Sequence, residues 1–400
     1  MAVLSEDCPK RLHPPFSRAL FPLIFLAVIF FLNFLSRILF SPLLPIIEKE
    51  MDFGHAVSGS FFLLISSGYF IALLFSGCVS SRLGHKRTIV LSTVVTGLVL
   101  VVLGNCQSLT GLRVALVALG LATGLYLPSG LASITALVAP PYWGRGMAVH
   151  ELAPNIGFVL APLLAGMMVQ ELSWRQGLQV AGVCIVLMGG LYGYSGRGAG
   201  EKGRPPQLQV LRTFLVQPQF WLMVLLFSLA ICSTLGVYAM LPLLLVTEQG
   251  MAGEAANRLL AVSRLCAILM PVPAGWLGDR FGNRPMMIAV LFLAGLLTIP
   301  LGVFSGGPLL AAVILQPMVA VCFFPSGFAV LSGMGEKGEG AAVISLCIPL
   351  AFFLGGGAMP TLIGFVGDKI GLGAGFILAG SAMTVAPLVS ALALRGSPRQ

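Results

Sequence analysis

A short polar turn occurs twice in this 400-residue chain, as Gly77-Cys-Val-Ser-Ser81-Arg82-Leu-Gly84-His-Lys86-Arg87 and as Gly275-Trp-Leu-Gly-Asp279-Arg280-Phe-Gly282-Asn-Arg284. Its two outer glycines and its first arginine recur 198 residues apart. Two further clusters recur at spacings of 198 and 197: Gly157, Pro162 and Gly166 as Gly355, Pro360 and Gly364, and Pro128-Ser129-Gly130 as Pro325-Ser326-Gly327. Three clusters at nearly one spacing predict that the chain is an internal duplication.

The composition around these turns excludes a soluble fold. Hydrophobic residues make up 57% of the chain and charged residues 9%, whereas an average globular protein has about 25% charged residues. This excludes a cytosolic enzyme, a nucleic-acid-binding module and a secreted disulfide scaffold. The eight cysteines show no Cys-x-x-Cys spacing, so they predict neither a metal site nor a disulfide framework.

Twelve apolar runs are long enough to span a bilayer, whose core of about 30 Å needs about 20 apolar residues. They lie at 20–47, 57–80, 88–105, 111–138, 148–171 and 176–194, and then at 219–247, 257–278, 287–304, 308–333, 342–367 and 375–394. We therefore predict an all-α membrane protein with twelve transmembrane helices. They should form two pseudo-symmetric six-helix bundles, at 1–194 and 219–400, joined by a polar linker at 195–218.

The positions of the basic residues predict the orientation, because cytoplasmic loops carry excess Lys and Arg. With a cytoplasmic N-terminus, that side holds Lys10, Arg11, Arg18, Arg82, Lys86, Arg87, Arg145, Arg197, Lys202, Arg204, Arg212, Arg280, Arg284, Lys337, Arg395 and Arg399. The opposite side holds only Lys49, Arg113, Arg175, Arg258 and Lys369. We expect both termini and the linker in the cytoplasm, and a multi-pass protein of the inner (plasma) membrane. This bias also accounts for the net charge of +9 without nucleic acid as a partner.

Both turns resemble the loop signature of the major facilitator superfamily, Gly-x-x-x-Asp-Arg-x-Gly-x-basic-basic. The second copy matches it better, because the first has Ser81 where the second has Asp279. The resemblance covers the whole chain and implies a secondary transporter whose halves rock around a site near the bilayer midplane. Arg82 and Arg280 of the two turns are candidate gating residues. Asp279 is expected to meet Arg145 and the start of the run 148–171 when the cytoplasmic side closes.

The stretch Asn33-Phe-Leu-Ser36-Arg37, followed by Ser41 and Pro45, resembles the first-helix pattern of the organic anion/cation symporters of this superfamily, with Ser36 in place of an Asp. Arg37 lies about ten residues, or about 15 Å, from the outer end of its run. Placing a guanidinium there costs about 2.5–3.5 kcal/mol, so it should face a cavity or a partner. Arg264 lies at nearly the same depth in the second half, and we expect both to hold one anionic substrate. The alternatives are hydrogen bonds to carbonyls, or side chains that reach the membrane surface.

Further polar residues inside the apolar runs are candidates for contact with the substrate or for coupling transport to protons. The candidate substrate contacts are Asn33, Tyr126, Ser129, Tyr238 and Ser326, although such residues are also typical of helix packing. Glu151 is the candidate proton carrier. Its alternative role is to neutralise the helix N-terminus and to pair with Arg145.

The expected function is secondary transport of a small organic anion, such as a carboxylate, by a monomer coupled to protons in symport. No phosphate-binding loop and no metal-spaced cluster occur in the sequence, so we expect neither ATP coupling nor a cofactor or metal, and no enzymatic activity. One alternative is proton-coupled efflux of amphipathic compounds, since Gly157-x-x-x-Ala161-Pro162-x-x-x-Gly166 resembles the antiporter motif of drug exporters. The other is a membrane receptor or sensor that kept the fold.

Overall fold

The apolar runs fold into helices that are long enough to cross a membrane. A computed structural model describes residues 16–199, 202–203, 214–334 and 340–395, and all regular structure in these ranges is helical. Eleven helical stretches have the length and hydropathy of a membrane span, and the bent pair of α12 (Gly253–Ala267) and α13 (Pro271–Phe281) makes a twelfth. The predicted fold class, an all-α protein of twelve spans, is confirmed.

The spans are divided, in chain order, into two groups of helices. The first group contains α1 (Phe16–Ile38), α2 (Phe40–Met51), α3 (His55–Leu83), α4 (His85–Asn105), α5 (Leu109–Gly124), α6 (Tyr126–Leu137), η1 (Pro140–Tyr142), α7 (Trp143–Glu171) and α8 (Trp174–Ser195). The second contains α10 (Pro218–Ile231), η2 (Cys232–Gly236), α11 (Val237–Leu243), η3 (Leu244–Glu248), α12 (Gly253–Ala267), α13 (Pro271–Phe281), α14 (Asn283–Val303), α15 (Gly306–Ala320), α16 (Phe323–Ser332), α17 (Gly340–Ala351), η4 (Phe352–Ala358), α18 (Met359–Ile370) and α19 (Leu372–Arg395). Half of the predicted linker, residues 200–201 and 204–213, lies outside the described residues.

Several spans are interrupted where the apolar pattern predicted continuous helices. The first span breaks at Leu39 and then runs to Met51, past the expected end at residue 47. In the eighth span, α12 and α13 meet at 41°, because Pro271 and Pro273 follow the break and proline cannot continue the helical hydrogen bonds. The seventh and eleventh spans contain π-helical stretches at η2, η3 and η4. Such breaks change the backbone without changing the hydropathy of the run.

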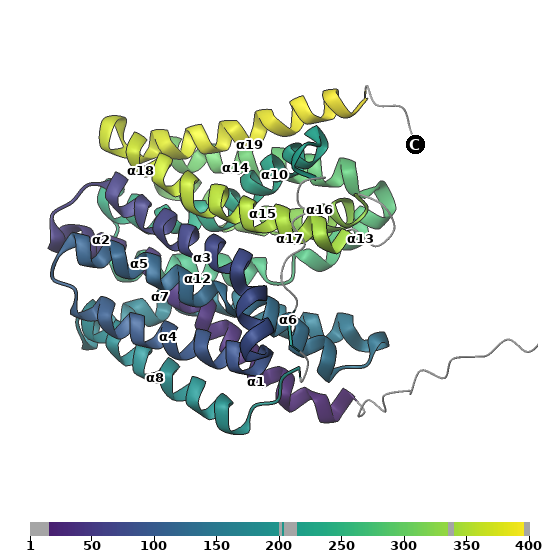
Figure 1. Ribbon diagram of the computed structural model, residues 1–400. Helices are drawn as coiled ribbons and strands as arrows, with labels where there is room; N and C mark the ends of the chain where they lie inside the picture. Colours follow the sequence, from purple (N-terminus) through teal and green to yellow (C-terminus); the bar gives the residue numbers. More distant parts are fainter. Residues whose placement is uncertain (1–15, 200–201, 204–213, 335–339, 396–400) are drawn as a thin grey trace, which may run out of the picture.

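The two groups of helices meet mainly through α3 with α18, α7 with α12, and α2 with α11. Figure 1 shows the first group in purple to teal below the second in green to yellow, with the ribbons side by side near α2 and α18 and diverging toward α6 and α13. We call the end with Met51 and His55 the predicted outer end, and the end with Leu83 and Phe281 the predicted cytoplasmic end. The groups are therefore joined at the predicted outer end.

Glycines allow the closest approach between the halves. A Cβ added at Gly59 of α3 would lie 2.3 Å from the carbonyl oxygen of Pro360, and one at Gly364 of α18 would lie 2.1 Å from that of His55. Within the second half, a Cβ at Gly355 would lie 2.0 Å from the carbonyl oxygen of Ser228. At Gly355 and Gly364, the repeated glycines thus serve close helix packing.

Asp368 adds a polar contact between the halves at the predicted outer end. Its carboxylate in α18 accepts hydrogen bonds from the backbone N–H groups of His55, at 2.7 Å, and Ala56, at 3.0 Å. These are orphan donors at the N-terminus of α3, where a negative charge is favourable. Asp368 of the second half therefore caps a helix of the first.

Candidate functional site

Arg37 lies near the end of α1, two residues before the break at Leu39. Its guanidinium carbon lies 4.3 Å from the ring centroid of Tyr69 in α3 and 5.4 Å from that of Phe34. The side chain is partly buried, and its Nε is buried without a hydrogen-bond partner among the described residues. The break in the helix and the aromatic faces thus hold a cation inside the first span, with one donor unused.

Arg264 lies in the second half, on α12. Its guanidinium carbon lies 4.5 Å from the ring centroid of Phe158 in α7 and 4.8 Å from that of Tyr238 in α11. One terminal nitrogen donates a hydrogen bond of 2.6 Å to the carbonyl oxygen of Thr234. Only 5% of the residue is exposed, so Arg264 does not reach the membrane surface. The alternative of a hydrogen bond to a carbonyl applies to this arginine.

An aromatic contact connects the two arginines across the halves. Phe34 and Phe158 meet edge to face with centroids 5.0 Å apart, and Phe158 meets Tyr238 in the same way at 4.9 Å. Arg37 lies over the first ring of this series, and Arg264 lies over the last two. Among the described residues, neither arginine forms an ion pair with a carboxylate. The interface therefore carries two uncompensated positive charges separated by two rings.

The π-helical stretch η2 supplies the carbonyl oxygens of this region. Besides the Thr234 carbonyl, the Ser233 carbonyl accepts a hydrogen bond of 2.8 Å from the amide of Gln316 in α15. Gln316 is 1% exposed, and the sequence analysis missed it, as it missed Tyr69 and Phe158. A glutamine or tyrosine within an apolar run was the available signal, but no pattern indicated which helix each would face.

The other predicted substrate contacts lie at different places. Asn33 donates to the carbonyl oxygen of Thr123 at 3.0 Å, and its own Oδ1 is buried and has no partner in the part of the chain that the structure describes. Tyr238 is buried at the aromatic contact, with its hydroxyl 3.4 Å from the carbonyl oxygen of Phe158. Asn33 and Tyr238 thus lie on the helices that carry the two arginines or on their direct neighbours.

Tyr126, Ser129 and Ser326 lie away from the aromatic contact between the arginines. The Tyr126 hydroxyl donates to the Leu26 carbonyl at 2.9 Å. The Ser129 hydroxyl lies 3.2 Å from Nδ1 of His85, and the buried hydroxyl of Ser326 has no partner within the described ranges. A Cβ at Gly278 would lie 2.5 Å from the Ser326 hydroxyl, so both serines lie beside the repeated turns.

Glu151 lies two turns into α7, and 60% of its side chain is exposed. Among the described residues, Glu151 forms no ion pair with Arg145, and its ion-pair contact is with His150, whose Nδ1 lies 3.4 Å from Oε1. Arg145 instead lies over the ring of Tyr142, at 5.2 Å from the centroid. The two residues diverge because a separation of six residues along α7 places them on different faces.

The candidate gating residues are exposed at the predicted cytoplasmic end. Asp279, Arg145 and Arg82 are exposed, and among the described residues none of them forms an ion pair. Arg280 lies over the rings of Trp276 and Phe281, at 5.4 and 5.7 Å from the centroids. Asp279 and Arg145 are therefore apart in this state.

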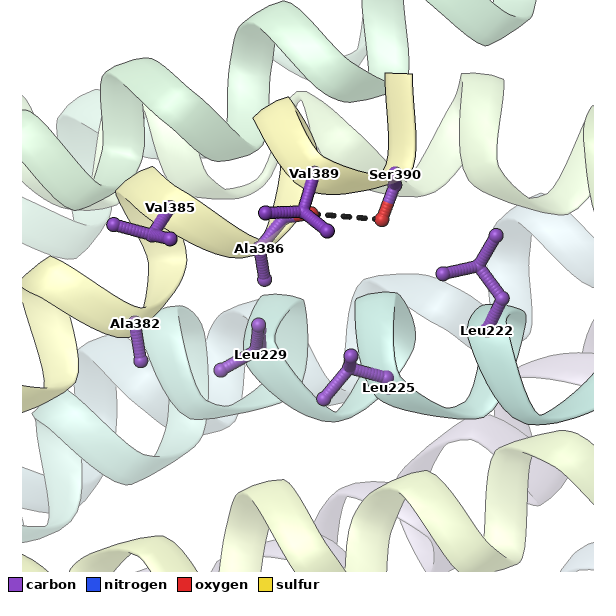
Figure 2. A pocket seen from close by; sticks show the side chains of 8 residues that line it. All are labelled: Leu222, Leu225, Leu229, Ala382, Val385, Ala386, Val389 and Ser390. Carbon is purple, nitrogen blue, oxygen red and sulfur yellow. Dashed lines mark hydrogen bonds between the residues drawn. The ribbon is translucent and has the colours of Figure 1, made fainter. Parts of the chain in front are cut away.

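Two hollows lie outside the arginine region. Figure 2 shows a groove of about 340 Å³ between α10 and α19, lined by leucine, valine and alanine side chains with Ser390 at one end. Its single hydroxyl donates to the Ala386 carbonyl of its own helix at 2.7 Å, so the groove offers nothing to recognise a charged solute. A second hollow, of about 700 Å³, lies toward the predicted outer end and is lined in part by Lys49, Glu50, Glu254 and Asn257.

Two halves of six spans with an arginine inside each are typical of membrane proteins built from internal repeats. Residues 26–263 and 245–400 match the family model of the Major Facilitator Superfamily. The chain belongs to this superfamily, and it is a multi-pass membrane protein. The family predicted from the repeated turns is confirmed.

Proteins of similar sequence are named as a transporter, a sensor and a multidrug resistance protein. The chain is 23% identical over 239 residues to the uncharacterized MFS-type transporter YuxJ of Bacillus subtilis, covering 58% of this chain and 61% of that protein. It is 24% identical over 302 residues to the membrane sensor protein UhpC of Salmonella typhimurium, covering 69% and 67%. It is 25% identical over 278 residues to the multidrug resistance protein MdtG of Escherichia coli, covering 65% and 66%. The matches thus span only 61 to 67% of these relatives' length.

Solved structures share the fold over nearly the whole chain. A bacterial homolog of the human lysosomal transporter Spinster, in an inward-facing and occupied conformation, superposes with a TM-score of 0.77 at 14% identity, covering 96% of each chain. The nucleoside transporter NupG superposes with a TM-score of 0.74 at 13% identity, covering 94% of this chain and 100% of that one.

Proposed function

We propose that this transporter moves a small organic anion of the carboxylate class. The observation that carries the proposal is the pair of guanidinium groups, Arg37 from the first half and Arg264 from the second, at the ends of one aromatic contact and without an ion-pair partner among the described residues. Uncompensated charge inside a membrane span is costly, and an anion is its electrostatic complement. The planar fork of arginine can bind a carboxylate through two parallel hydrogen bonds.

Alternating access would use the contacts described above. The halves are joined at the predicted outer end, while Asp279 and Arg145 are unpaired at the other, and this supports an inward-open state. The unused Nε of Arg37 is buried, so a substrate that enters from the cytoplasm would reach it only once the side chain moves. Arg264 would exchange its bond to the Thr234 carbonyl for one to the substrate as the halves move.

Proton symport is the proposed energy source, with Glu151 as the carrier. Its carboxylate lies on the face of α7 that also carries Phe158, because residues seven apart on a helix share a face. A proton that binds there would offset the charge of the anion during transport. We further propose that the termini and the linker are cytoplasmic, that the membrane is the plasma membrane, and that the protein works as a monomer.

Efflux of amphipathic compounds by proton exchange is the second candidate. It is favoured by the similarity to a protein named for multidrug resistance and by the rings of Phe34, Phe158 and Tyr238, which suit lipophilic solutes as well as cations. The similarity to a membrane sensor protein supports a third candidate, in which the fold binds a ligand without moving it.

Counterflow in proteoliposomes tests these candidates. Vesicles are loaded with one unlabelled solute and exposed to the same labelled solute, chosen from monocarboxylates, dicarboxylates, organophosphates, nitrate and a lipophilic cation. We expect exchange of at least one carboxylate, lost in Arg37→Ala and kept in the control Arg113→Ala, whose arginine is exposed near the predicted outer end. Exchange of the lipophilic cation alone would favour efflux, and no exchange of any solute would favour a sensor.

A further inference from the structure

His150 is a buried histidine in a transmembrane span, and the anion site does not use it. It is 1% exposed on α7, and its ring stacks on that of Phe30 with centroids 4.1 Å apart and planes inclined by 6°. The ring of Tyr126 lies parallel to it at 5.9 Å. A face of an aromatic ring stabilises a cation, so this environment suits an imidazolium as well as a neutral imidazole.

The hydrogen bonds of Tyr126 assign the tautomer of this histidine. Its hydroxyl lies 2.9 Å from the Leu26 carbonyl oxygen and 3.1 Å from Nε2 of His150. A hydroxyl has one proton, and a carbonyl oxygen only accepts, so the Tyr126 proton is donated to Leu26. The Tyr126 oxygen must then accept from His150, and Nε2 carries a proton in every state. The titrating nitrogen is Nδ1.

Nδ1 faces the carboxylate of Glu151, with 3.4 Å between Nδ1 and Oε1. An unprotonated Nδ1 and an ionised carboxylate are both acceptors, and they would repel each other. The contact is favourable only when one proton lies between them, on the imidazole or on the carboxyl group. The pair is therefore arranged to hold one proton.

The two residues differ in their access to solvent. The Glu151 side chain is 60% exposed and the His150 side chain 1%, so a proton exchanges with water through Glu151. Two further titratable groups act on this part of α7 through electrostatics: Tyr69 of α3 on Glu151, and Tyr192 of α8 on Tyr126. Tyr69 also lies against Arg37. Tyr69 thus interacts both with Glu151 of the proton site and with Arg37 of the anion site.

We propose that His150 and Glu151 form one proton-binding unit and that Nδ1 of His150 holds the coupling proton. The proton enters from water at Glu151, forms an N–H bond at Nδ1 and leaves by the same route, and no other bond changes. Tyr126 is a positioning residue, since it fixes the tautomer without touching the proton. The role in coupling rests on the proposed symport, whereas the binding of the proton does not.

Nitrogen NMR of histidine-labelled protein in lipid nanodiscs tests the unit without any substrate. The chain has four histidines, and His150→Gln assigns the signal by its loss. We expect the Nε2–H tautomer at high pH and a doubly protonated ring as the pH falls. Tyr126→Phe should let both neutral tautomers appear. A signal that stays neutral down to pH 4, or that shows the Nδ1–H tautomer, would overturn the proposal.

Glu151→Gln tests whether the two residues act as a unit. At a pH where both forms are visible, the ratio of protonated to neutral His150 should fall about three- to tenfold, because one adjacent negative charge is lost and solvent screens part of it. The control Glu171→Gln changes an exposed carboxylate at the other end of α7 and should leave the ratio unchanged. An unchanged ratio in Glu151→Gln would contradict the unit.

Transport then tests coupling separately. Any labelled carboxylate that the wild type exchanges is offered under an imposed pH gradient, and His150→Gln should abolish gradient-driven accumulation. Accumulation that persists in His150→Gln would overturn the coupling role. If the wild type exchanges no carboxylate, the proposed anion transport fails while the NMR result still decides the proton site.

Discussion

At the scale of single residues, Arg37 combines a partly buried charge with an unused donor. Replacing it with lysine keeps the charge but removes the planar fork, while the ring of Tyr69 remains in place. We expect Arg37→Lys to weaken the affinity for the transported carboxylate. Truncating one partner of a buried charge pair typically costs about 2–5 kcal/mol of binding free energy, and the loss here should approach that range. Binding measured on purified protein checks this, with Arg113→Lys as the control. An unchanged affinity would remove Arg37 from the site.

Arg264 has a structural bond as well as the proposed substrate contact. Arg264→Ala leaves the Thr234 carbonyl without its side-chain donor, at a cost of about 1–3 kcal/mol in stability. If both arginines hold one anion, the losses of affinity in Arg37→Ala and Arg264→Ala should not add up in the double variant. Thermal unfolding measures the first effect and a double-mutant cycle the second. Additive losses of affinity would indicate two independent sites.

At the scale of helices, the approach of α3 to α18 depends on the absence of a side chain at Gly59. A methyl group there would lie 2.3 Å from the Pro360 carbonyl oxygen, so Gly59→Ala must push the helices apart. We expect labelling of cysteines placed at the predicted outer end to increase. Gly190→Ala in α8 is the matched control, because no atom lies within 4 Å of its added Cβ. Equal labelling in the two variants would show that the contact does not hold this end closed.

The cap of α3 by Asp368 gives a second, polar contribution to the same contact. Loss of a capping side chain costs about 0.5–2 kcal/mol. Asp368→Ala should therefore shift the population toward the outward-open state, and Asp368→Asn should do so less because one oxygen remains. Fluorescence distances between labels on the two halves measure this shift. A larger effect of the asparagine than of the alanine variant would contradict capping as the cause.

At the scale of the whole molecule, closing the predicted cytoplasmic end should open the predicted outer end, so contacts at the two ends compete in one conformational equilibrium. Closing the predicted cytoplasmic end would bring Asp279 to Arg145 and the start of α7, at a few tenths to about 1 kcal/mol for each contact. Ser81 has no charge, and its hydroxyl donates to the Cys78 carbonyl of its own helix at 2.8 Å. The outward-open state would thus be stabilised by the contact of Asp279 alone, since Ser81 supplies no equivalent charged contact in the other half.

Asp279→Asn should shift the population toward inward-open and slow transport without changing substrate affinity, and Ser81→Asp should shift it the other way. Cysteine accessibility measured from both sides of the membrane reports the shift. If neither variant changes accessibility on either side, the gate model is wrong.

Much of the fold followed from local sequence. The apolar runs predicted the twelve spans, and the repeated turns predicted the duplication and the family, because hydropathy and turn glycines act through their immediate neighbours. The depth of Arg37 and Arg264 could likewise be counted along the chain. The breaks at Leu39 and before Pro271 were missed, since an apolar run has the same hydropathy whether straight or bent.

The sequence by itself determined that this protein is a membrane protein of the major facilitator superfamily with an arginine inside a span of each half. Only the tertiary structure decided what those arginines contact: Tyr69 for Arg37, and Phe158 with the Thr234 carbonyl for Arg264. It also placed His150 between Tyr126 and Glu151. The physical reason is that hydropathy is summed along one helix, whereas these partners lie on other helices and depend on which faces pack together.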